Sequence, residues 1–276
     1  MSLFSNDSEF LKLLAHRRDI DLIDVSLELA RDANPDLDFR PTQNWINDQA
    51  FEVGRISSVC RSEHAVLDNL VSHLVEECGL RGDPAVFHRP ESSYLPHVIE
   101  TGLGIPISLS VIYMEIARRA GIELQGIPAP LHFLSRHQTE RGAVFVDAYS
   151  AGRMLSQTEC LHWLQAQTGL SAEQIIPTLR TASPRQIVIR MLNNLRGIYC
   201  RNEDWSAAFR VQQRLAALNP IDYDAQVDLG QLALRANVPG PAYDVFRRCA
   251  THSGRKEPQR LQMLLREAKR RIALSN

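Results

Sequence analysis

The amino-acid sequence predicts an α+β protein with helical regions at both ends and a small antiparallel sheet between them. Apolar residues recur at helical spacing up to about residue 80 and again from about residue 183. Between these regions, and after a helix bounded by Pro106 and Gly121, the apolar period changes to two. We therefore expect a helical region over residues 1–90, a core over 91–182 and a helical tail over 183–276.

Composition excludes several classes of protein. The 276 residues are 44% apolar and 23% charged, as is typical of soluble globular chains, and the net charge of −1 gives no overall field that would attract nucleic acid. The longest mainly apolar stretch, 105–117, contains Glu115 and is too short to span a bilayer, so no membrane partner is expected. The five cysteines are odd in number and form no CxxC pair, which favours free thiols and a cytoplasmic location.

Three helices are expected before residue 80, over residues 9–19, 21–33 and 65–79, because each segment repeats apolar residues at helical spacing. Asp19 can cap the second of these helices, and Gly79 can end the third. Residues 81–93 are dense in Pro, Gly and Ser and are expected to form a loop.

The next helix has the clearest boundaries. Pro106 suits its first turn, and Gly121 suits the position just past its end. Its apolar residues fall at i, i+3, i+4, i+7, i+8 and i+11, which predicts one buried stripe. The residues of this stripe are Leu109, Ile112, Tyr113, Ile116, Ala117 and Ala120.

Strands are expected over 124–128, 131–137 and 143–149. If Gln138 to Arg141 form a four-residue hairpin loop, His137 pairs with Gly142, and counting back places His132 opposite Asp147. A slip of one residue would put these two side chains on opposite faces of the sheet.

From about residue 183 the helical pattern repeats with a period of 34 residues, which is typical of tetratricopeptide units. Pro220 ends the first unit, and residues 258–272 are expected to form a capping helix. Two ordinary helical hairpins with coincidental spacing are the alternative. The matching pairs are Leu195 and Leu229, Ile198 and Leu232, Ala208 and Ala242, Phe209 and Tyr243, and Val211 and Val245.

The segment GIPISL, the HF pair and FVDA with its following glycine are similar, in combination, to the bacterial SirB branch of the transglutaminase-like superfamily. The resemblance covers nearly the whole chain and is strongest from 92 to 160. It implies a helical N-terminal region, a papain/transglutaminase-like core with a central helix on a small antiparallel sheet, and tetratricopeptide-like helical hairpins. One motif departs from the pattern, since an NSYL-type sequence reads SSYL at 92–95.

The wider superfamily implies an acyl-transfer site in which a cysteine at the start of the core helix is the nucleophile, a strand histidine is the base and an aspartate orients that histidine. His132 matches the base and Asp147 matches the orienting residue. The nucleophile position falls at or near 106–108, where no residue is cysteine. The resemblance thus implies that the thiol chemistry has been lost, unless Cys60, Cys78 or Cys160 approaches the cleft from elsewhere.

Two main interpretations follow for function. The leading one is a binding or regulatory pseudoenzyme, in which the cleft around Ser108, His132 and Asp147 holds a peptide or small ligand and the tail contacts a partner protein. The alternative is a hydrolase or acyltransferase on an amide or ester, with Ser108 as nucleophile in the first turn of the helix. In a simpler interpretation, Ser108 has no role in catalysis and only caps that helix. A third class is a scaffold in which the tail alone acts.

Four further residues are expected near the cleft, namely Gly104, Pro106, Tyr149 and Arg153, although a solvated surface charge is favoured for Arg153. No metal-binding or phosphate-binding motif is present, so no metal or cofactor is expected.

The C-terminal helix is rich in Lys and Arg, which could bind an acidic partner or nucleic acid. The interpretation as a solvated cap is favoured there, because aromatic residues for base stacking are absent.

Overall fold

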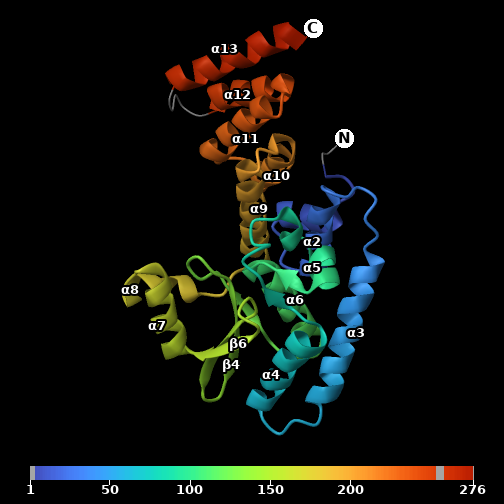
Figure 1. Ribbon diagram of the computed structural model, residues 1–276. Coiled ribbons are helices and arrows are strands. Elements are labelled where there is room, and N and C mark those ends of the chain that lie inside the picture. The colour runs from blue at the N-terminus through green and yellow to red at the C-terminus, as the bar shows by residue number, and fades with distance from the viewer. Residues whose placement is uncertain (1–3, 253–257, 276) are drawn as a thin grey trace. The chain divides into compact units, whose positions relative to one another are not determined.

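A computed structural model of the protein describes residues 4–252 and 258–275. The chain divides into two compact units, residues 1–191 and 192–276 (Figure 1). The first unit contains a four-stranded sheet with helices, and the second contains helices in its described residues. Helix α9 (Pro184–Arg201) begins in the first unit and ends in the second.

The first unit begins with four helices, α1 (Ser8–Leu14), α2 (Leu22–Arg31), α3 (Arg40–Ser57) and α4 (Glu63–Ser72), the last continued by a π-helical turn over His73–Glu77. The predicted cap of α2 was wrong. Asp21, and not Asp19, accepts hydrogen bonds from the first backbone N–H groups of this helix, while the Asp19 carboxylate binds Arg17. Gly79 follows the π-helical turn with a positive φ of 68°, which agrees with its predicted role.

The predicted loop over 81–93 contains short regular elements. Strand β1 (Arg81–Gly82) pairs in parallel with β2 (Leu103–Gly104), and a 3₁₀ helix covers Pro90–Ser93. Helix α5 (Leu95–Thr101), which the sequence analysis did not identify, connects this segment to β2. The loop residues are thereby fixed against the start of the central helix.

The central helix α6 (Pro106–Arg119) has the boundaries that the sequence predicts, with Gly121 just past its end at a φ of 80°. Its burial differs from the prediction, because every residue from Pro106 to Ala117 is buried instead of a single stripe. The helix packs against α2, α3 and α5 and also against the sheet. A helix enclosed in this way needs apolar residues on all sides.

The sheet of the first unit is antiparallel, in the order β3 (Gln125–Ile127), β4 (Leu134–Thr139), β5 (Gly142–Asp147) and β6 (Arg153–Ser156). Helices α7 (Gln157–Thr168) and α8 (Ala172–Ile175) follow it, and their apolar side chains form a common core with those of the sheet.

The predicted register between β4 and β5 was wrong by two residues. Thr139 pairs with Gly142, so the turn contains only Glu140 and Arg141, and His137 lies opposite Val144. His132 accordingly precedes β4 instead of lying within it. Because the shift is even, it keeps each side chain on the predicted face.

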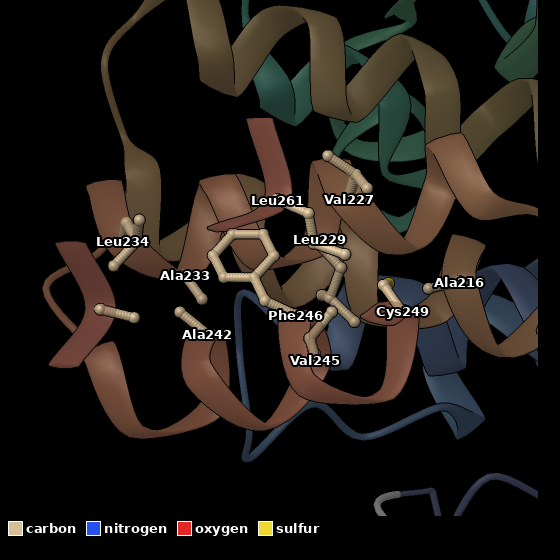
Figure 2. Close-up of a cluster of buried hydrophobic side chains, with 11 residues drawn as sticks. Ala216, Val227, Leu229, Ala233, Leu234, Ala242, Val245, Phe246, Cys249 and Leu261 are labelled. Carbon is tan, nitrogen blue, oxygen red and sulfur yellow. The ribbon is translucent and has the colours of Figure 1, made fainter. Parts of the chain in front are cut away.

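The second unit contains the end of α9 and the helices α10 (Trp205–Leu218), α11 (Tyr223–Arg235), α12 (Pro239–His252) and α13 (Pro258–Ser275). The ends of α9 and α11 are 34 residues apart, as are both ends of α10 and α12. Figure 2 shows the core of this unit, where Phe246 of α12 belongs to one buried cluster with apolar side chains of α11 and α13. A Cβ on Gly230 would come within 2.3 Å of the Phe246 ring, so this glycine allows the close packing of α11 on α12.

Candidate functional site

The structure brings His132 and Asp147 together, with 2.7 Å between His132 Nε2 and Asp147 Oδ1. Asp147 is the last residue of β5 and is completely buried, whereas the His132 side chain is 13% exposed. The contact therefore links the end of one strand to the segment that leads into its neighbour.

Backbone donors complete the surroundings of Asp147. Its Oδ1 accepts the N–H groups of Tyr149 at 3.1 Å and of Ser150 at 3.2 Å. Burial raises the pKa of this carboxyl, but the hydrogen bonds and the charge of His132, together with Ser150, hold the pKa below its usual range. Asp147 is thus a carboxylate at neutral pH. Within the described residues, its Oδ2 is buried and has no hydrogen-bond partner.

The same contact determines which nitrogen of His132 is available. In its neutral form, an imidazole beside a carboxylate carries its proton on the nitrogen that faces the carboxylate, which for His132 is Nε2. Nδ1 is then left as a hydrogen-bond acceptor, and no group in the described part of the chain bonds to it. His132 can therefore accept a proton or a hydrogen bond from a bound molecule.

A strained turn positions His132. Leu131 has a φ of 59°, a left-handed conformation that is unfavourable for leucine, and its side chain is 80% exposed. The guanidinium of Arg190, on α9, donates to the carbonyl oxygens of Ala129 and His132 and lies 5.7 Å from the Phe133 ring. Arg190 was missed by the sequence analysis, since nothing local connects it to a turn 58 residues earlier.

Ser108 makes a different set of contacts. Its hydroxyl is fully buried, donates to the Ser92 carbonyl at 2.8 Å and accepts the Ile105 N–H at 3.1 Å. The second bond is the usual reach of a residue at the third helical position back to the N-cap N–H. Among the hydrogen bonds of the described residues, none joins Ser108 to His132.

Gly104 and Pro106 support this helix start. Pro106 occupies the first helical position and is buried. A Cβ on Gly104 would lie 2.9 Å from the Ser108 hydroxyl and 2.9 Å from Leu109 Cγ. Only glycine fits here without moving the groups that hold Ser108.

The thiols near this region are not poised to react. Burial and the charge of Glu77 raise the pKa of Cys78 to about 11. Burial and the charge of Asp147 raise the pKa of Cys160, on α7, to about 12. A thiol is nucleophilic as its thiolate, so both groups are almost entirely in the unreactive form at neutral pH.

Three aromatic side chains, Trp163, Tyr149 and Phe87, and the exposed Leu131 lie near the pair. The rings of Trp163, on α7, and Tyr149 lie edge-on to the His132 ring, with centroid distances of 5.1 Å and 6.0 Å. Phe87 extends this row, 5.9 Å from Tyr149. Of these residues only Tyr149 was predicted. Arg153, the remaining predicted residue, lies opposite Asp147 in the β5–β6 ladder with its side chain exposed.

Tyr113, like Asp147, has a buried polar atom without a hydrogen-bond partner among the described residues. The Tyr113 hydroxyl, on α6, is buried without a hydrogen-bond partner in the described chain. Burial and nearby negative charge, including that of Asp147, raise the pKa of Tyr113.

Residues 4–252 and 258–275 contain no group of three or more His, Cys, Asp or Glu side chains arranged to hold a metal ion. In the same residues, no helix is long and apolar enough to cross a membrane.

Comparisons with known proteins identify relatives of this chain. A UPF0162 protein of Xylella fastidiosa strain Temecula1 is 33% identical over 216 residues, which are 76% of this chain and 75% of that protein. A UPF0162 protein of Pseudomonas aeruginosa is 33% identical over 144 residues, 51% of this chain and 52% of that one. Human F-box only protein 21 is 27% identical over 156 residues, which are 53% of this chain and 24% of the human protein. No solved structure matches the chain.

The family model described as transglutaminase-like superfamily matches residues 33–193, more than half of the chain. These residues include the central helix, the whole sheet and the His132–Asp147 pair. The chain therefore belongs to the transglutaminase-like superfamily.

Proposed function

We propose that this protein acts by binding and not by acyl transfer, as a pseudoenzyme that keeps the His–Asp pair of the superfamily without its cysteine nucleophile. The observation that carries the proposal is the Ser108 hydroxyl, which donates to the Ser92 carbonyl while His132 Nδ1 has no partner among the described residues. The helix start therefore supplies a capping residue where the superfamily places a nucleophile.

Acyl transfer needs a nucleophile that a base can activate. A serine hydroxyl attacks well only when its proton points to a base about 2.6–3.2 Å away. The Ser108 proton is directed to a backbone carbonyl, so the alternative Ser108–His132–Asp147 mechanism would first require the hydroxyl to leave two hydrogen bonds. Cys78 and Cys160 do not replace it, because their raised pKa values keep them protonated.

The groups around His132 suit a ligand with a donor next to an apolar group. Nδ1 accepts an N–H or O–H, while Trp163, Tyr149 and the exposed Leu131 provide apolar surface on either side. A peptide offers both features along one chain. The buried Asp147 keeps the imidazole in the accepting tautomer, so the pair serves binding by the same geometry that would serve catalysis.

The C-terminal unit carries the second half of the proposal. The ends of α9 and α11, and both ends of α10 and α12, are 34 residues apart, as in tetratricopeptide units, whose stacked hairpins commonly bind peptide segments of partner proteins. We take the unit to be such an array, with α13 as its cap. The free cysteines fit a reducing compartment, and we place the protein in the cytoplasm.

The absence of acyl transfer is tested with the purified full chain. Hydrolysis of amide and ester substrates and incorporation of a fluorescent amine into casein are measured for wild type, Ser108→Ala, Cys160→Ser and His132→Ala. We expect all four proteins to give the same background rate. A wild-type rate that falls in Ser108→Ala or in Cys160→Ser would overturn the pseudoenzyme proposal and identify the nucleophile.

Binding at the cleft is tested by selecting random displayed peptides on the full chain and measuring the selected peptides by fluorescence anisotropy. For the peptides that bind the cleft, we expect His132→Ala to weaken binding about tenfold or more, the usual effect of losing a buried hydrogen bond together with an apolar contact. His162→Ala is the matched control, because His162 is exposed on α7. If no selected peptide distinguishes His132→Ala from this control, the cleft does not bind peptides.

A further inference from the structure

A charged hollow of about 530 Å³ lies wholly within the C-terminal unit. Its lining residues come from α9, α11 and α13, the first helix of each hairpin and the last helix. Three guanidinium groups line it, those of Arg196, Arg235 and Arg271, together with Asp228 and Gln231. We call this hollow the arginine groove. Its volume is in the range of about 300–1,000 Å³ that is usual for ligand pockets.

Two of the three arginines already have acidic partners. Arg196 Nη1 donates to Gln212 Oε1 at 2.9 Å and lies 3.4 Å from an Asp228 carboxylate oxygen. Arg271 donates to Glu267 at 2.6 Å and to the Leu234 carbonyl at 2.8 Å. These contacts hold the walls of the groove in place.

Arg235 differs from both. It is exposed, and in the described part of the chain it forms no ion pair or hydrogen bond with a side chain or carbonyl. Its guanidinium instead lies over the ring of Trp205, 4.5 Å from the centroid. Stacking of this kind fixes the plane of the guanidinium and leaves the N–H groups at its edge free. The groove therefore presents one oriented cation without a counterion.

We propose that the arginine groove binds an acidic segment of a partner protein, with one carboxylate held by the N–H groups of Arg235. This inference deepens the proposed function, since it rests on the C-terminal unit as a partner-binding array. A carboxylate matches the planar fork of an arginine and accepts two parallel hydrogen bonds from it. Gln231 offers an amide for the peptide backbone beside that carboxylate.

The charges of the groove favour a carboxylate over nucleic acid. Asp228 lines the groove and Glu267 binds Arg271, so the excess of positive charge is small and a run of phosphates would be repelled by two carboxylates. Arg235 covers one face of the Trp205 ring, and this face is therefore not available to stack on a base. A single acidic side chain within an otherwise uncharged segment fits these conditions.

Gly197 provides a way to close the groove without changing its charge. It lies on the α9 wall, and a Cβ added there would meet nothing within 4 Å. A leucine at this position would project into open space and fill part of the groove. Gly240, on α12, has equally open surroundings and does not line the groove, so Gly240→Leu is a matched control.

The test uses the full chain and a displayed library of random twelve-residue peptides. We expect selection on wild type to enrich Asp and Glu relative to selection on Arg235→Glu. An enriched peptide with its acidic residue replaced by the amide should bind about tenfold more weakly, the usual effect of a lost charge-assisted hydrogen bond. Gly197→Leu should also weaken binding, whereas Gly240→Leu should leave it unchanged.

Two outcomes would overturn the proposal. One is a set of selected peptides without acidic enrichment, or with equal affinity for wild type and Arg235→Glu. The other is that the wild-type protein binds single-stranded RNA more tightly than every selected peptide and that Arg235→Glu loses this RNA binding. That result would assign the groove to nucleic acid. Failure here is distinguishable from failure at the cleft, because peptides that depend on His132 are measured separately with His132→Ala and are expected to bind Arg235→Glu normally.

Discussion

The His132–Asp147 pair and the Arg235–Trp205 pair hold an ionic group in opposite ways. Asp147 is fully buried, and one of its oxygens accepts from His132 and from two backbone N–H groups. Arg235 is exposed and lies on an aromatic ring with its donors free. A buried charge needs internal partners, whereas an exposed charge keeps its capacity for a ligand. Substitution of the buried Asp147 should therefore chiefly change stability, and substitution of the exposed Arg235 should chiefly change binding.

The largest effect is expected for Asp147→Ala. The substitution removes a fully buried carboxylate and leaves the partly buried His132 ring and the N–H groups of Tyr149 and Ser150 without their acceptor, so we expect the free energy of unfolding to fall by about 2–4 kcal/mol. Urea denaturation followed by circular dichroism measures this loss.

Arg153→Ala is the control for that experiment. Arg153 lies opposite Asp147 in the ladder, but its side chain is exposed, so its removal should change the free energy of unfolding by less than about 0.5 kcal/mol. If Asp147→Ala and Arg153→Ala lower the free energy of unfolding equally, the loss depends on the position in the β5–β6 ladder and not on the buried pair.

The next largest effect is expected for Gly104→Ala. The new Cβ would approach the Ser108 hydroxyl, Leu109 and Val98 to 3.0 Å or less, and all three are held by packing or hydrogen bonds. Overpacking of this kind costs about 1–3 kcal/mol. A crystal structure of the variant should show the Ser108 hydroxyl displaced from the Ser92 carbonyl. A variant of unchanged stability would mean that the helix start is looser than these contacts indicate.

Local signals explain which parts of the fold the sequence could predict. The limits of α6 were predicted correctly because Pro106 and Gly121 act on their own segments of backbone. Asp19 and Asp21 are two residues apart and chemically identical, so sequence alone could not choose the one whose backbone is extended at the cap. The register of β4 and β5 depended on the length of a turn, and the two-residue turn at Glu140–Arg141 moved it.

The site was predicted only in part for the same reason. His132 and Asp147 match positions of a known core, and they are in contact although the predicted register was wrong and His132 precedes β4. Trp163 and Arg190 come from helices later in the chain, and only the tertiary fold brings them to His132. The roles of Ser108, His132 and Asp147 in function stay predictions.

Acid should weaken the buried pair in a defined direction. The pKa of Asp147 in the folded protein lies below its ordinary value, so the unfolded chain binds the proton more tightly. The stability that ionised Asp147 contributes is complete above its unfolded pKa and is lost as pH falls below about 4. Asp147→Asn lacks this contribution, so the difference in unfolding free energy between wild type and Asp147→Asn should shrink between pH 6 and pH 3.

The other carboxyls with lowered pKa values, such as Glu159 and Glu267, are present in both proteins, so their contributions cancel in this difference and the coupled Asp147–His132 pair remains. Urea denaturation at intervals of half a pH unit provides the measurement. A difference that stays constant or grows as pH falls would mean that Asp147 is not held in its charged form by the fold.

The smallest effect is expected in the C-terminal unit, for Gly197→Ala. Gly197 is exposed within α9, and a Cβ there meets nothing within 4 Å, so the substitution changes only helix propensity. We expect the free energy of unfolding to rise by about 0.5–1 kcal/mol, the advantage of alanine over glycine in a helix interior. The fluorescence of Trp205, with the other two tryptophans replaced by phenylalanine, reports unfolding of this unit alone. The same substitution then has opposite signs at Gly104 and Gly197, because one glycine is needed for buried contacts and the other leaves a groove open. A loss of stability at Gly197 would contradict that contrast and would mean that the open side of α9 is already occupied.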